Sequence, residues 1–163
     1  MYGYVGNNPV NFVDPNGLYL GPWHGAITFV AMIASGYDPV MAAFTAGANI
    51  GADFIPDSQD PENSNQHGMA TPKQNVEQAK KGTEKYINEQ IDRGNLFGLG
   101  NALHATEDQF TGGHKYKTWD GKITLEHIFY DVIPFGAYDA FKADLKLLKK
   151  YRKRGSSAGG CPR

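Results

Sequence analysis

The pattern of apolar and polar residues predicts helices along most of this chain. Residues 25–35 and 39–51 are apolar and rich in alanine, and the stretch Gly36-Tyr37-Asp38 separates them. Asp38 is an expected N-cap, with Pro39 at the first position of the second helix. We therefore expect two apolar helices joined by a short turn.

The helical pattern continues in the more polar part of the chain. A polar helix is predicted from Thr71 and Pro72 to about Arg93, and further helices over residues 96–110, 124–132 and 138–153. Residues 54–71 are rich in Pro, Asp, Ser and Asn and are predicted to form a long loop, which is unusual in a compact domain unless it serves a purpose. Because strand patterns are almost absent, the sequence predicts an all-α fold, a compact helical bundle.

Composition limits the kinds of site that the chain can build. Its 163 residues suit one ordinary domain, with a net charge of -1. The single cysteine, Cys161, excludes an intramolecular disulfide framework and a CxxC site for zinc or redox chemistry. A metal site in this chain must therefore use histidine and carboxylate.

Charge is distributed unevenly. Residues 141–163 carry a net charge of +7, whereas the rest carries -8 and contains all five histidines. The basic end has two interpretations: a solvated helix face with a frayed tail, or a patch that attracts an anionic substrate, either a lipid surface or nucleic acid. No segment has the roughly 18–20 apolar residues of a membrane span, and residues 1–4 lack the features of a signal peptide.

Histidines and aspartates recur at helical spacing. His104 and Asp108 are four residues apart, His127 and Asp131 repeat this spacing, and His114 lies between the two pairs. Residues four apart share one helix face, so the pairs can converge on metal ions, and neutral imidazole with carboxylate suits zinc. The alternative is that these side chains are solvated, or are buried histidines satisfied by their neighbours.

The order of these residues resembles a known superfamily. From His24-Gly-Ala-Ile-Thr28, through Ala52-Asp53-Phe54 and His67-Gly-Met, to the two HxxxD pairs, the chain is similar to the zinc-dependent phospholipases C. That superfamily also contains fungal single-strand nucleases. The resemblance implies an all-α bundle of this type with up to three zinc ions.

The same resemblance implies a role for each ligand. One zinc would be held by His67, His104 and Asp108, with Asp53 as a ligand or general base. A second would be held by His114, His127 and Asp131, and a third by His24, with Asp108 bridging to it. Lys115 and Lys117, beside His114, could help to hold a phosphate, or could be surface lysines.

The first segment has a different character. Residues 2–18, ending in Asp14-Pro-Asn-Gly-Leu18, resemble the end of the core of RHS repeat-associated polymorphic toxins. The resemblance implies cleavage after Leu18, with Asp14 belonging to the processing protease. It divides the chain into 1–18, the end of the core, and 19–163, an all-α toxin domain.

Cleavage would make Tyr19 a new N-terminus, and its α-amine could complete the third zinc site. The alternative is that residues 19–22 are a linker and Trp23 packs against the core. The resemblance also implies an RHS shell before release, an immunity protein as partner, a monomer after release, and delivery into a target cell by a type VI or similar secretion system.

The sequence therefore predicts a zinc-dependent phosphodiester hydrolase. Membrane phospholipid is the expected substrate, as in the phospholipases C. Asp131 is typical of the nucleases instead, so a nuclease of the same fold is the first alternative. The second alternative is a non-enzymatic, membrane-disrupting toxin whose metal only stabilises the fold.

Overall fold

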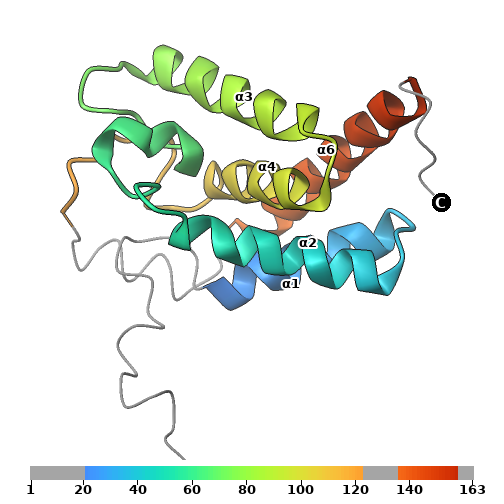
Figure 1. Cartoon of the computed structure of the whole chain (residues 1–163). Helices are drawn as coiled ribbons and strands as arrows, with labels where there is room; N and C mark the ends of the chain where they lie inside the picture. The colour runs from blue at the N-terminus through green and yellow to red at the C-terminus, as the bar shows by residue number, and fades with distance from the viewer. Residues whose placement is uncertain (1–20, 123–135, 158–163) are drawn as a thin grey trace, which may run out of the picture.

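The computed structural model of the chain describes residues 21–122 and 136–157 (Figure 1). Within these ranges the regular structure is helical, apart from one isolated bridge between Ala70 and Thr118. The prediction of an all-α fold is thus confirmed. The segment 1–18, the new terminus at Tyr19 and the helix predicted over 124–132 lie outside the described residues.

The first two helices form an antiparallel pair. Helix α1 spans Gly21–Ala34 and α2 spans Pro39–Gly51. The Asp38 side chain accepts hydrogen bonds from the amides of Val40 and Met41, which confirms the predicted cap. None of the helices that the structure describes is both long enough and apolar enough to span a membrane.

The segment after α2 contains more helix than the sequence suggested. A first 3₁₀ helix, η2 (Ala52–Phe54), ends where the predicted loop 54–71 begins, and a second, η3 (Pro61–His67), lies within that loop. Helix η3 begins with Pro61 and ends at His67, and it is followed by Gly68, whose φ of 61° is the left-handed value that glycine adopts without strain. The prediction of a long loop without helix was wrong because short 3₁₀ turns do not need an apolar repeat.

Helix α3 spans Val76–Asp92 and begins later than predicted. Asn75 caps it, because its side chain accepts from the amide of Gln78 while the Gln78 side chain accepts from the amide of Asn75. This reciprocal capping box stabilises a start at residue 76. The Gln74 side chain accepts from the amide of Thr71, so the predicted start at Thr71 and Pro72 was wrong.

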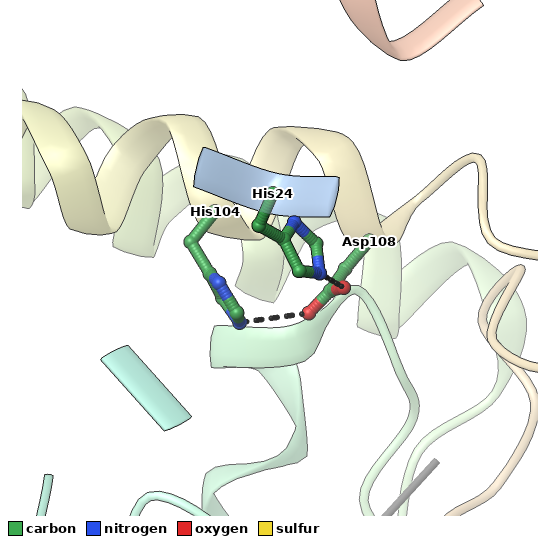
Figure 2. Close-up of side chains that lie close together, drawn as sticks. All are labelled: His24, His104 and Asp108. Carbon is green, nitrogen blue, oxygen red and sulfur yellow. Dashed lines mark ion pairs between the residues drawn. The ribbon is translucent and has the colours of Figure 1, made fainter. Parts of the chain in front are cut away.

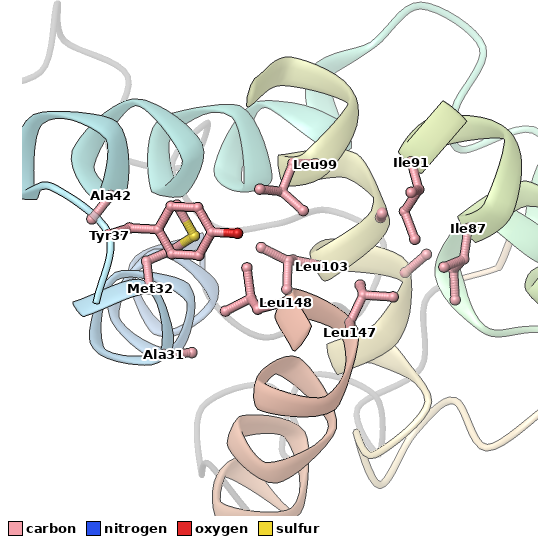
Figure 3. Close-up of a cluster of buried hydrophobic side chains, with 12 residues drawn as sticks. Ala31, Met32, Tyr37, Ala42, Ile87, Ile91, Leu99, Leu103, Leu147 and Leu148 are labelled. Carbon is pink, nitrogen blue, oxygen red and sulfur yellow. The ribbon is translucent and has the colours of Figure 1, made fainter. Parts of the chain in front are cut away.

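Helix α4 (Leu96–Asp108) lies at the centre of the fold, where it contacts α2, α3 and α6 (Ala137–Ser157) (Figure 1). Every residue from 98 to 108 is buried. The adjoining apolar core joins side chains of α1, α2, α3, α4 and α6, and Figure 3 shows Leu103 and Leu148 near its centre. A helix buried on all sides must satisfy its polar side chains with protein partners.

The close approach of α4 and α2 requires glycine at position 100. A Cβ at Gly100 would lie 2.6 Å from the Ala48 Cβ and 2.8 Å from the Thr45 carbonyl oxygen. We expect Gly100→Ala to lower the free energy of unfolding by about 1–3 kcal/mol, measured by denaturant titration. Gly47→Ala is the matched control, since its Cβ would meet no atom within 4 Å in the part of the chain that the structure describes, and alanine favours helix. Equal stability of the two variants would contradict this packing.

Candidate metal centre

Five side chains predicted to bind metal meet where α1, α2 and α4 approach the 3₁₀ helices. His24 comes from α1, Asp53 from η2, His67 from the last position of η3, and His104 and Asp108 from the end of α4. All five side chains are at most 6% exposed. The ends of four separate elements thus bring three imidazoles and two carboxylates together.

Three ligand atoms, from His67, His104 and Asp108, form a nearly equilateral triangle, and a fourth, from Asp53, lies beside it. The Nδ1 atom of His67 lies 3.1 Å from the Nε2 atom of His104, and the Asp108 Oδ2 atom lies 3.2 Å from each of them. The Asp53 Oδ1 atom lies 3.2 Å from His104 Nε2 and 3.6 Å from His67 Nδ1. Asp53, His67 and His104 form one group that could hold a metal ion.

His24, His104 and Asp108 form a second such group (Figure 2). The Nε2 atom of His24 lies 3.3 Å from Asp108 Oδ1, while Asp108 Oδ2 faces His104. The His24 and His104 rings are neighbours, with centroids 4.5 Å apart. His104 belongs to both groups, and Asp108 presents one oxygen to each side.

The remaining predicted ligands are placed only in part. His114 is buried, its Nδ1 donates to the His67 carbonyl oxygen at 2.9 Å, and the same atom lies 3.8 Å from Asp108 Oδ1. Lys115 and Lys117 are exposed in the same loop. His127 and Asp131 lie outside the described residues, so the second predicted zinc site is described only at His114.

The buried charges shift one another's pKa values. Burial and the neighbouring His104 favour neutral His24, but hydrogen bonds to Asp108 and Glu107 outweigh them and raise the pKa of His24 to about 9. Burial also opposes charge on His104, yet Asp53 and Asp108 raise its pKa well above 6.5. Burial favours neutral Asp108, but His104 and His114 hold its pKa well below the usual range. The site therefore gathers carboxylates that require cations, either protons or metal.

Sequence reasoning missed a layer of side chains behind the ligands. Glu107 accepts a hydrogen bond from His24 Nδ1 at 2.5 Å, and from Thr28 at 2.7 Å. Asn49 contacts both Glu107 and His104. The buried Asp144 of α6 faces Glu107, and burial together with Glu107 raises the pKa of Asp144 well above 3.8.

The sequence contained two signals for this layer. Thr28 follows His24 by four residues, as Asp108 follows His104, so the two share a helix face. Asp144 is the single acid among residues 141–163. A solvated basic helix face does not need an acid at this position, so its presence was a signal of a buried role. Comparisons of the chain with protein-family models, curated proteins and solved structures found no significant match.

Proposed function

We propose that the chain is a zinc-dependent phosphodiester hydrolase that acts on membrane phospholipid in the manner of a phospholipase C. The observation that carries the proposal is the arrangement of three ligand atoms, His67 Nδ1, His104 Nε2 and Asp108 Oδ2. Their mutual distances are 3.1, 3.2 and 3.2 Å. Three corners of a regular tetrahedron with edges of about 3.2 Å lie about 2.0 Å from its centre, which is the usual distance from zinc to nitrogen and oxygen ligands, and the fourth corner would be open to water.

The donor set also suits zinc. Imidazole nitrogen with carboxylate oxygen is a common zinc environment, whereas calcium and magnesium prefer oxygen ligands alone. When bound, zinc would lower the pKa of a coordinated water to about 7 and neutralise charge on the phosphate oxygens.

Asp53 is the side chain that best fits the role of general base. It is 6% exposed, whereas Asp108 is fully buried, so Asp53 lies nearer to solvent. The Gln59 amide lies 3.4 Å from Asp53 Oδ1 and 3.4 Å from His67 Nε2, which orients the carboxylate. Asp53 can therefore accept a proton from a water at the edge of the site.

Lipid is favoured over nucleic acid by exposed apolar side chains on α1, the helix from which the buried His24 comes. These side chains are Trp23 (40% exposed), Val30 (55%) and Ile33 (40%). Exposed apolar side chains suit contact with a lipid surface. Because Trp23 is 40% exposed, its expected packing against the core is only partial. Exposed lysines of α6, among them Lys149 and Lys150, support the nuclease alternative instead.

The same proposal includes delivery as a toxin. The chain would be released from an RHS shell after Leu18, enter a target cell through a secretion system, and be neutralised there by an immunity protein. Release would place the α-amine of Tyr19 five residues before His24, a buried member of the site. The sequence motif at residues 14–18 supports this part of the proposal.

The test is metal analysis followed by activity measurements. We expect bound zinc, and release of phosphorylated head group from phosphatidylcholine or phosphatidylglycerol vesicles that stops with a chelator. Chelator-sensitive cleavage of single-stranded DNA without lipid hydrolysis would favour the nuclease. Vesicle leakage that continues with chelator, and without lipid hydrolysis, would favour the non-enzymatic toxin. Absence of bound metal would contradict all the metal-dependent alternatives.

A further inference from the structure

Asn49 of α2 lies behind the candidate ligand His104 and contacts Glu107, the partner of His24. It is fully buried, and its carboxamide makes three hydrogen bonds. Its Oδ1 accepts from His104 Nδ1 at 3.2 Å, and its Nδ2 donates to Glu107 Oε1 at 3.1 Å and to Thr28 Oγ1 at 2.7 Å. The Glu107 partner fixes the orientation of the amide. Because a carboxylate oxygen only accepts hydrogen bonds, the atom of Asn49 that faces Glu107 must be Nδ2.

Glu107 extends this network to His24. Its Oε1 accepts from Thr28 and Asn49, while its Oε2 accepts from His24 Nδ1. All four side chains are fully buried or nearly so, which makes each bond costly to lose. Carboxylate and carbonyl oxygens behind metal-binding histidines fix the ring orientation in this way in other metal sites.

The consequence is seen on the other side of each ring. With Nδ1 of both histidines held from behind, Nε2 of His24 points at Asp108 Oδ1 and Nε2 of His104 at Asp108 Oδ2, 3.3 and 3.2 Å away. A half-turn of either ring would present a carbon atom instead. Figure 2 shows the two rings with these nitrogens directed at the same carboxylate.

We propose that Asn49 is a positioning residue that orients His104 directly and His24 through Glu107, so that one carboxamide couples the two groups of metal ligands. The inference rests on the metal site of the proposed function, although it concerns metal binding and ring orientation rather than catalysis. The hydrogen bond between Thr28 of α1 and Glu107 of α4 connects the two helices in this network.

The experiment compares Asn49→Leu with Asn101→Leu, which removes a buried asparagine of α4 that bonds to Gln90. Zinc affinity is measured by competition with a chromophoric chelator, without substrate. We expect a loss of about 10- to 100-fold for Asn49→Leu and little change for Asn101→Leu. If the wild-type chain binds zinc but does not hydrolyse lipid, the proposed function is wrong, whereas the role of Asn49 in metal binding is unaffected.

Thr28→Val provides a second variant in case Asn49→Leu does not fold. Thr28→Val keeps the side-chain volume but removes the hydroxyl that bonds to Glu107, whereas Thr28→Ser keeps this hydroxyl. Thr83→Val is the control, because the buried Thr83 hydroxyl has no hydrogen-bond partner among the described residues. We expect Thr28→Val to weaken zinc binding about 10-fold, with wild-type affinity for Thr28→Ser and Thr83→Val.

A metal-free measurement separates orientation from metal affinity. In nitrogen-15 spectra of the metal-free chain, the Nδ1–H proton of His104 should exchange slowly in wild type and rapidly in Asn49→Leu. Slow exchange in the variant, or wild-type zinc affinity in both Asn49→Leu and Thr28→Val, would overturn the proposal. Reduced affinity together with rapid exchange would support it.

Discussion

Asp108→Asn is expected to lower zinc affinity by at least about 100-fold and to reduce phosphodiester hydrolysis to the background of the assay. Substituting a residue that only supports metal ligands typically lowers metal affinity 10- to 100-fold. Asp108 is itself a candidate ligand and contacts His24 and His104 directly, so its loss should have a larger effect. The asparagine keeps the shape but removes the charge and directs an N–H₂ group toward a histidine nitrogen. Metal content and hydrolysis of phospholipid vesicles measure the two effects.

The control for this variant is Asp139→Asn, the same change at an exposed acid of α6 that pairs with Lys142. It should bind zinc and hydrolyse substrate like the wild type, because exposed ion pairs contribute little. Circular dichroism of Asp108→Asn checks that the chain still folds. A folded Asp108→Asn variant with normal metal content would show that the ligand assignment is wrong.

The parts of the site that the sequence predicted are those fixed by local spacing or by order along the chain. His104 and Asp108 share one helix face, and the structure places their side-chain atoms 3.2 Å apart. His24, Asp53 and His67 followed from the order of residues in the resemblance. Asp38 was recognised as a cap because its role depends only on the next few residues.

The parts that the sequence did not predict depend on contacts between distant elements. Asn49 acts through Glu107, which is 58 residues away, and through His104, which is 55 residues away. No periodic pattern along the chain contains such pairs. The strongest available signal was α4 itself: a helix of small and apolar residues implies burial on all sides, and Glu107 within it must then have partners.

Removal of metal is expected to destabilise the chain, by an amount that increases with pH between about 6.5 and 9. Zinc would bind the deprotonated histidines, so it would compete with the protons that stabilise the metal-free site. Zinc at a free concentration of about 1,000 times its dissociation constant would add about 4 kcal/mol to the free energy of unfolding. Melting temperatures with saturating zinc and with chelator, at pH 6, 7.5 and 9, measure the difference.

The direction of the pH dependence follows from His24. Its pKa rises from 6.5 to about 9 on folding, so its protonation stabilises the metal-free fold fully below pH 6.5, and this stabilisation is lost as the pH rises through about 9. The loss is on the order of 3 kcal/mol. The same deprotonation would strengthen zinc binding, so the melting temperatures with zinc and without metal should diverge as the pH rises. A difference that stays constant with pH would mean that zinc does not replace the His24 proton. Asp108→Asn should show a much smaller zinc effect than the wild type at every pH.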